Sequence, residues 1–462
     1  MTPGTKKTLR VVGALVVLGL ALPVSNLLVG LPEGTALTKV PPKDARTANV
    51  TQVLEGSCAG CHVAGVKPPF YAALPVAKTI IERDMKEGLR DFDLASGFGP
   101  AAAGPVPEPV LARIEREVKD GEMPPAAYVA LHWNAALGGG KKEAVLAWIK
   151  EERAAQAAAG VPEALKVALL RPIPETVGHD PAKAALGEKL YNDKRLSGDG
   201  TVSCASCHDL ARGGTDQHPV SDGIRGQKGG INSPTTFNSA LNFVQFWDGR
   251  APTLEAQAGG PPMNPVEMGS ATWPEIVEKL NKDKAFRKEF EAVYPEGFSD
   301  KTITHAIAEF ERTLVTPNSR FDKYLKGDTA ALVADEKHGY EVFLEKGCAT
   351  CHVGELLGGK SYEVMGRRGD YFVARGTPQT DADNGRFNQT KDEKERHAFK
   401  VPTLRNVALT FPYFHDGSKK TLREAVDAMA VYQVGEPLSE KDARDVVEFL
   451  ETLTGEYKGK AL

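Results

Sequence analysis

This chain of 462 residues has no cysteine outside three short motifs, few aromatic residues and no cluster of basic charge. The absence of spare cysteines leaves none for a separate disulfide framework. A net charge of −4 without a basic stripe argues against nucleic acid as a partner. No long alternation of apolar and polar residues occurs, so we expect a mostly α fold. The length is too great for one domain.

The six cysteines form three copies of one pattern, Cys58-Ala-Gly-Cys61-His62, Cys204-Ala-Ser-Cys207-His208 and Cys348-Ala-Thr-Cys351-His352. Cys-x-x-Cys-His is typical of c-type haem attachment, in which both thiols bond to the porphyrin and the histidine binds the iron. A redox dithiol does not explain the histidine, and a zinc site lacks further ligand clusters. The pattern predicts three covalent haems and a protein that moves electrons.

The amino terminus predicts export of the chain. Lys6, Lys7 and Arg10 precede an uncharged run over residues 11–31, which is long enough to cross a bilayer as a helix. The basic flank should stay in the cytoplasm, which puts the rest outside. The alternative is a cleaved signal peptide with an apolar stretch over 11–22 and a break at Pro23. We expect the uncleaved anchor.

The nearly even spacing of the motifs predicts three cytochrome c-like haem domains behind the transmembrane helix. We expect the flank and anchor over 1–37, and haem domains over 38–160, 161–327 and 328–462. A charged, polar stretch over 376–400 is expected to be a mobile surface loop. Helices are predicted at residues 109–120, 141–159, 273–290, 302–314, 334–346, 421–432 and 439–454.

The second iron ligands decide between electron transfer and chemistry, because an open iron can bind peroxide. Met123, which two prolines follow after a predicted helix, is a candidate ligand of the first haem. Spacing alone supports two interpretations of Met429 equally, as an iron ligand and as a core residue. His218 is a weak candidate for the second haem. Glu267, in a proline-rich loop, is either a proton-transferring carboxylate or a solvated one.

Residues 163–455 resemble the bacterial dihaem cytochrome c peroxidase family. The residues before them resemble a separate haem-binding domain, with Cys-x-x-Cys-His and a later Met-Pro-Pro-x-x-Tyr. Together with the predicted anchor, the chain is similar to membrane-anchored, three-haem quinol peroxidases. The motifs that carry the family resemblance are Val202–His208, Asn232–Thr235, Gln245–Arg250, Glu267-Met268, Thr316–Asp322, Val401–Asn406 and Pro412–Gly417.

The resemblance implies a role for each of these sites. The His208 haem matches the peroxidatic haem, and the His352 haem matches the electron-transfer haem. The other implied roles are Met429 as distal ligand of the electron-transfer haem, Trp247 between the two haems, Glu267 and Gln257 in the peroxide pocket, and Asn232 with the carbonyls of Thr410 and Pro412 around one Ca²⁺.

The chain departs from the family at one position. Typical members hold a histidine on the resting peroxidatic iron, where gap-free alignment puts Ile224. Isoleucine cannot bind iron, so that haem is open at rest or His218 reaches it; we expect the open state. A sister group of tryptophan-modifying dihaem oxidases has tyrosine where this chain has Met429, which favours the peroxidase side.

The expected function is reduction of hydrogen peroxide to water in the periplasm of a bacterium, with a single-pass anchor in the inner membrane. Membrane quinol or a small cytochrome c would supply electrons through the first and third haems to the second. No quinol pocket can be identified from the sequence. The alternatives are a multihaem electron carrier, a dihaem oxidase acting on a protein substrate, and a haem sensor, although no signalling domain follows the last haem.

Overall fold

The computed structural model describes residues 20–21, 23–27, 37, 39, 41–95, 105–157 and 161–462. Most of the predicted anchor over 11–31 lies outside these residues. Among the helices that are described, none combines the length and the apolar character needed to cross a bilayer. The chain is mostly helical, and its contacts divide it into two compact units, Met1–Gln156 and Ala157–Leu462.

The first unit contains the first haem motif and has its own apolar core. Trp148 and Val145 of the last helix pack in this core with Leu54, which precedes the motif, and with Leu111. The side chain of Asp44 caps the first long helix by accepting a hydrogen bond from the Thr47 amide (2.7 Å). The helices are α2 (Ala45–Ser57), α3 (Ala59–His62), α4 (Pro75–Asp91), α6 (Glu108–Asp120), α7 (Ala126–Leu131) and α8 (Lys141–Ala155).

The second unit contains the other two haem motifs. Its helices are α9 (Pro181–Tyr191), α10 (Cys204–Cys207), α11 (Leu254–Ala258), α12 (Gly260–Met263), α13 (Trp273–Asn281), α14 (Lys284–Glu291), α15 (Asp300–Arg312), α16 (Arg320–Leu325), α17 (Ala334–Glu345), α18 (Tyr371–Arg375), α19 (Phe387–Thr390), α20 (Leu422–Met429) and α21 (Glu440–Glu451), with a π-helical turn over Ala430–Val434. The strands are β1 (Tyr362–Val364), β2 (Ala398–Lys400), β3 (Glu456–Tyr457) and β4 (Lys460–Ala461).

The predicted single helix over 273–290 was wrong. The chain breaks into α13 and α14 because the Asp283 side chain accepts a hydrogen bond from the Phe286 amide (3.0 Å), which starts a new helix. The predicted helices over 109–120, 302–314 and 334–346 are confirmed within two residues at each end by α6, α15 and α17.

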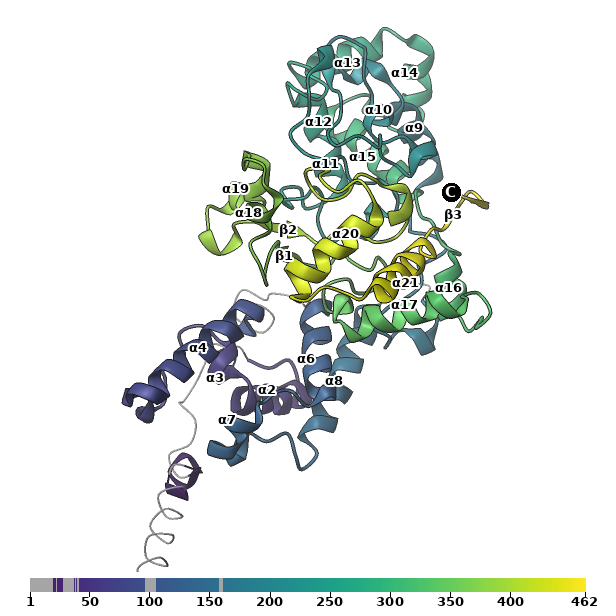
Figure 1. Ribbon diagram of the computed structural model, residues 1–462. Helices are drawn as coiled ribbons and strands as arrows, with labels where there is room; N and C mark the ends of the chain where they lie inside the picture. Colours follow the sequence, from purple (N-terminus) through teal and green to yellow (C-terminus); the bar gives the residue numbers. More distant parts are fainter. Residues whose placement is uncertain are drawn as a thin grey trace, which may run out of the picture. The chain divides into compact units, whose positions relative to one another are not determined.

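One helix pair is repeated in the second unit. The helix before each haem motif packs against a later helix, α9 on α15 and α17 on α21 (Figure 1). The close approach requires glycine, because a Cβ on Gly187 would overlap the Ala306 carbonyl and one on Gly339 would overlap the Asp445 carbonyl. Each pair has a separate apolar core around it, so the polypeptide before each motif is firmly held.

The segment over 376–400 is not simply a polar surface loop, which corrects the sequence expectation. It contains α19 and β2, and β2 pairs antiparallel with β1, with Lys400 opposite Tyr362. Asp383 is only 1% exposed and binds the Arg375 guanidinium (2.7 and 2.9 Å). Although burial opposes ionisation, the Arg375 guanidinium and the His415 ring hold the pKa of Asp383 well below its usual range.

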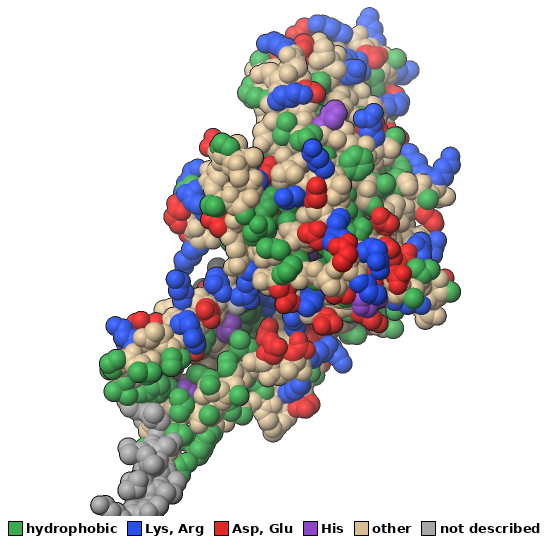
Figure 2. All heavy atoms as spheres, viewed as in Figure 1, with side chains coloured by type: hydrophobic (Ala, Val, Ile, Leu, Met, Phe, Trp, Pro, Cys, Tyr) green, Lys and Arg blue, Asp and Glu red, His purple; other side chains and the backbone are tan. Residues whose placement is uncertain are grey.

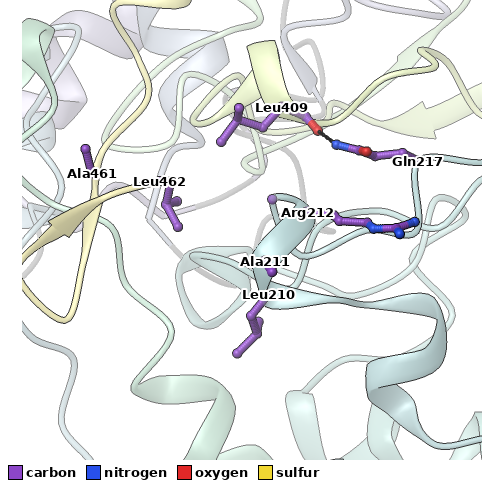
Figure 3. A pocket seen from close by; sticks show the side chains of 8 residues that line it. Leu210, Ala211, Arg212, Gln217, Leu409, Ala461 and Leu462 are labelled. Carbon is purple, nitrogen blue, oxygen red and sulfur yellow. Dashed lines mark hydrogen bonds between the residues drawn. The ribbon is translucent and has the colours of Figure 1, made fainter.

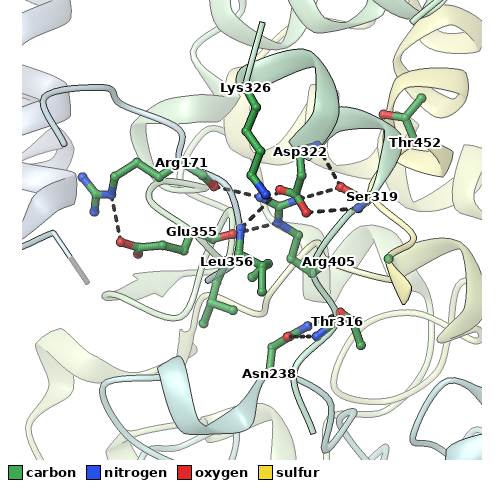
Figure 4. Close-up of polar contacts among 12 residues, drawn as sticks. Arg171, Asn238, Thr316, Ser319, Asp322, Lys326, Glu355, Leu356, Arg405 and Thr452 are labelled. Atoms are coloured by element: carbon green, nitrogen blue, oxygen red, sulfur yellow. Dashed lines mark hydrogen bonds and ion pairs between the residues drawn. The ribbon is translucent and has the colours of Figure 1, made fainter. Parts of the chain in front are cut away.

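A fully buried guanidinium joins distant parts of the second unit (Figure 4). Arg405 contacts the Asp322 carboxylate (2.9 Å), donates to the Glu355 carbonyl (2.7 Å) and donates to the Arg171 carbonyl (2.8 Å). Arg171 in turn donates to the Glu355 carboxylate (2.9 Å). These bonds tie the amino-terminal stretch of the unit, the start of α16 and the loop after the third haem motif to one side chain.

We predict that Arg405→Met lowers the free energy of unfolding of the haem-loaded protein by about 3 to 5 kcal/mol, because the buried Asp322 carboxylate loses its cation and keeps only the Ile173 and Ser319 amides as partners. Urea unfolding followed by far-UV circular dichroism measures the loss. The double variant Arg405→Met/Asp322→Leu removes both charges and should recover more than half of it. A single variant as stable as the wild type contradicts the assignment of Arg405 as a structural hub.

Candidate haem centres and redox site

Two of the three motif histidines are oriented for iron binding by a backbone carbonyl. Nδ1 of His62 lies 3.0 Å from the Phe92 carbonyl oxygen, and Nδ1 of His352 lies 2.9 Å from that of Leu357. Nδ1 therefore carries the proton, and Nε2 has no partner among the described residues. A histidine held in this way offers its Nε2 lone pair to a metal. The residues present fit a covalent haem c at both motifs.

His208 is oriented differently. Its Nδ1 is buried and makes no hydrogen bond of good geometry among the described residues, although the Gly214 and Pro234 backbone groups lie near the ring; burial lowers the pKa of the ring, which favours the neutral imidazole. The Tyr191 hydroxyl donates to the His208 carbonyl (2.7 Å) and so fixes the backbone behind the ring. Both thiols of this motif lie on α10, so the second haem also fits its site.

The first unit contains an aromatic cluster that sequence reasoning missed. Tyr128 stacks on His132, with 4.0 Å between ring centroids, and the Tyr71 hydroxyl lies 2.7 Å from Nε2 of His132. A Cβ on Gly60, inside the first motif, would lie 3.3 Å from the Tyr128 hydroxyl. The spacing Met-Pro-Pro-x-x-Tyr was the available signal. Met123 itself is half-buried in the turn after α6.

Glu267 and Ile224 are joined by a backbone hydrogen bond beside the second motif. The Ile224 amide donates to the Glu267 carbonyl (2.7 Å), and the Ile224 side chain is 2% exposed. Asn264 donates to the Glu267 carboxylate (2.8 Å). Burial raises the pKa of Glu267, while Arg250 and Asn264 oppose the shift. Burial also raises the pKa of the Cys207 thiol, and the nearby Glu267 charge adds to that effect, so the carboxylate lies close to the motif.

The other two candidates near the second motif lie elsewhere. The side chain of His218 is 54% exposed, and its Nδ1 lies 4.0 Å from the Asp216 carboxylate, so it is directed to solvent. The neighbouring Gln217 donates to the Leu409 carbonyl (3.1 Å) at the edge of a pocket that the carboxyl terminus helps to line (Figure 3). Gln257 lies on α11 and makes no hydrogen bond to Glu267 in the described structure.

Trp247 lies at a junction of the second unit. Its indole N–H donates to the Asn232 carbonyl (2.9 Å), and its own carbonyl accepts from the Lys400 amide (2.7 Å). The ring meets Phe399 edge-on, with 6.2 Å between centroids, and packs in the same apolar cluster as Met429. The structure therefore brings together three residues that the family resemblance singled out, Trp247, Asn232 and Met429.

The predicted calcium ligands have oxygens to offer. Asn232 anchors two loops, because its side-chain amide donates to the His218 carbonyl (2.9 Å) and its backbone amide donates to the His415 carbonyl (2.7 Å). The carbonyls of Thr410 and Pro412 accept no hydrogen bond from any described residue. Free carbonyl oxygens together with a side-chain amide oxygen suit Ca²⁺. The chemistry of this donor set fits the ion.

A second group of potential metal ligands is already neutralised. The donor atoms of Asp383, His415 and Asp416 lie within 4.8 Å of one another. However, Arg375 bonds to both carboxylates (2.7 Å each), and His415 lies 2.7 Å from Asp383. The guanidinium supplies the positive charge that a metal would bring.

On the visible face of the second unit, Lys and Arg are interspersed with Asp and Glu, without a basic stripe (Figure 2).

Comparisons with known proteins match the parts of the chain that contain the three haem motifs. Three family profiles match, "Di-haem cytochrome c peroxidase" over residues 181–330, "Haem-binding domain" over 31–151 and "Cytochrome c" over 336–454. The cytochrome c peroxidase Ccp of Escherichia coli is 47% identical over 87% of this chain and 86% of its own length. The cytochrome c551 peroxidase of Pseudomonas aeruginosa is 43% identical over 62% of this chain and 85% of its own.

A sister protein and a solved structure extend the match. The methylamine utilization protein MauG of Methylorubrum extorquens is 33% identical over 63% of this chain and 85% of its own length. The crystal structure of a MauG-like protein associated with microbial copper homeostasis is 30% identical, with a TM-score of 0.56 over 65% of this chain and 95% of that one.

Proposed function

The chain belongs to the dihaem cytochrome c peroxidase family, and we propose that it is a three-haem peroxidase that reduces hydrogen peroxide to water at the His208 centre. The observation that carries this function is the half-buried Glu267, held beside the second haem motif next to an isoleucine that cannot bind iron. The three haems, when bound, supply the iron that takes up peroxide and the electrons for its reduction.

The protein's own contribution at the peroxide pocket is proton transfer and shape. Glu267 has a pKa raised by burial, so it can accept a proton from one peroxide oxygen and return it to the other. Asn264 aims the carboxylate by donating to it (2.8 Å). The family resemblance adds Gln257 as a neighbour in this pocket. Ile224 excludes water and leaves the iron position open at rest, and the exposed His218 supports this reading.

We further propose that Trp247 lies between the second and third haems and that Met429 binds the third iron. The contact of Trp247 with the Met429 cluster supports both roles. One Ca²⁺, bound by Asn232 and the carbonyls of Thr410 and Pro412, would fix the two loops that meet at Trp247. The hydrogen bond from the indole to the Asn232 carbonyl supports this link.

The electron donor is membrane quinol, and the first haem, with His62 and Met123 as ligands, receives the electrons. The uncharged run over 11–31 supports a membrane donor, because it would hold the chain at the inner membrane with the haems in the periplasm. The match of the E. coli protein across 87% of this chain supports a joint role of the first unit and the dihaem unit. A small soluble cytochrome c is the alternative donor.

We predict that Glu267→Gln lowers kcat/KM for hydrogen peroxide by about 10² to 10⁴-fold with all three haems bound, because a positioned acid–base group contributes that much. The acid limb of the wild-type pH profile should disappear with it. This limb reflects protonation of Glu267, so activity rises with pH through its raised pKa. Glu275→Gln, on α13 and paired with Lys279, is the matched control. A Glu267→Gln enzyme with near-normal activity would contradict the assignment.

We predict that the oxidised wild type shows high-spin ferric haem by EPR and reacts with peroxide without prior reduction. Ile224→His should convert this haem to low spin and make activity depend on reducing the His352 haem first, whereas Ile224→Leu should keep it high spin. A wild type that is wholly low spin, and stays so in His218→Ala, would show that another ligand occupies the iron.

We predict that Met123→Ala changes the absorption spectrum of one haem and slows quinol-driven turnover by at least tenfold, because loss of a methionine ligand lowers the potential of the entry haem. The pre-reduced dihaem unit should still react with peroxide at the wild-type rate. Met85→Ala, a half-buried methionine of α4, controls for loss of packing. Identical haem spectra in Met123→Ala and the wild type would make Met123 a core residue.

A further inference from the structure

Lys400, the last residue of β2, is a buried cation without a partner. Its side chain is 6% exposed, and its ammonium makes no hydrogen bond or ion pair with any described residue. Burial lowers the pKa of Lys400 to about 8, and no nearby carboxylate offsets this shift. The buried arginines of the described structure, Arg153, Arg171 and Arg405, each contact a carboxylate.

An ammonium on so buried a side chain is unfavourable without an anion, and no described carboxylate supplies one. The surroundings of β2 indicate which anion is available. The Val401 amide donates to the Ser361 carbonyl (2.9 Å), and the Leu404 amide donates to the Leu356 carbonyl (3.1 Å). The chain that leaves Lys400 therefore runs along the segment whose Leu357 carbonyl orients His352.

Two contacts place the backbone of Lys400 near the same centre. Phe399 packs in the cluster that contains Met429, the proposed second ligand of the third iron. The Lys400 amide donates to the Trp247 carbonyl (2.7 Å). The backbone of Lys400 thus lies beside Trp247, which is proposed to separate the second and third haems, and is adjacent in the chain to the cluster that contains Met429.

We propose that the Lys400 ammonium binds a propionate carboxylate of the His352 haem. The inference rests on the haem assignment of the proposed function and adds a binding residue to it. A haem brings two carboxylates, and one of them supplies the missing anion. The ion pair keeps that propionate ionised in a buried place, and the positive charge favours the reduced iron. The backbone amide of Lys400, which donates to the Trp247 carbonyl, would also fix the position of Trp247 relative to this propionate.

The test is a spectroelectrochemical titration of the complete three-haem protein in the absence of peroxide. In Lys400→Met, we expect the equilibrium constant for reduction of the His352 haem to fall about tenfold, which is about 59 mV for one electron. Its potential should also become pH-dependent, because the unpaired propionate takes up a proton on reduction. Lys400→Arg should keep the wild-type potential, as should Lys394→Met, which removes an exposed charge just before β2.

The affected haem is identified as the one whose spectrum changes in Met429→Ala. An unchanged potential in Lys400→Met, or a change confined to another haem, would overturn the proposal. If Lys400→Met does not load three haems, redox-difference infrared spectra with ¹³C-labelled propionates decide: Lys400→Arg should shift one carboxylate band, and no shift rejects the ion pair. The titration measures haem potentials without peroxide. A protein that lacks peroxidase activity therefore contradicts the proposed function but does not decide the Lys400 proposal.

Discussion

The buried guanidinium of Arg405 is the contact on which the second unit depends. It binds the Asp322 carboxylate and the carbonyls of Glu355 and Arg171, so three segments far apart in the chain meet at one cation. Two residues after Glu355, the Leu357 carbonyl orients the His352 ring. The carbonyl that orients the His352 ring therefore lies in a loop that Arg405 holds. A haem bound at His352 would therefore find its histidine already oriented by a backbone carbonyl.

The parts of the molecule that sequence reasoning predicted are those with local causes. The haem motifs need only neighbouring residues, and α15 and α17 follow from apolar periodicity within a few turns. The break before α14 was missed because a single capping bond at Asp283 outweighs a continuous helical pattern. The segment over 376–400 was misjudged because the partners of Asp383 include His415, far along the chain. Whether a charged residue is buried depends on such distant partners, so it cannot be predicted from the composition of its own segment.

The candidate site shows the same division. Glu267 could be singled out from its proline-rich loop, but only the fold provides its contact with Ile224 and the aim that Asn264 gives its carboxylate. Spacing left His218 open as an iron ligand. In the structure its carbonyl faces inward, accepting from Asn232, while its ring is exposed. The backbone of His218 thus takes part in the buried hydrogen-bond network while its side chain faces solvent, and no sequence pattern predicts this combination.

The junction at Trp247 is held mainly by backbone groups, and this has a consequence for electron transfer. The indole N–H is fixed by the Asn232 carbonyl, the Trp247 carbonyl is fixed by the Lys400 amide, and Phe399 closes one edge of the ring. The two hydrogen bonds have backbone partners, so they do not use the side chains of Asn232 or Lys400. In our proposals Asn232 binds a calcium ion and Lys400 binds a propionate. Both charges would therefore contact residues whose backbones are bonded to Trp247. Ion binding and haem potential would then be coupled through a tryptophan that itself carries no charge.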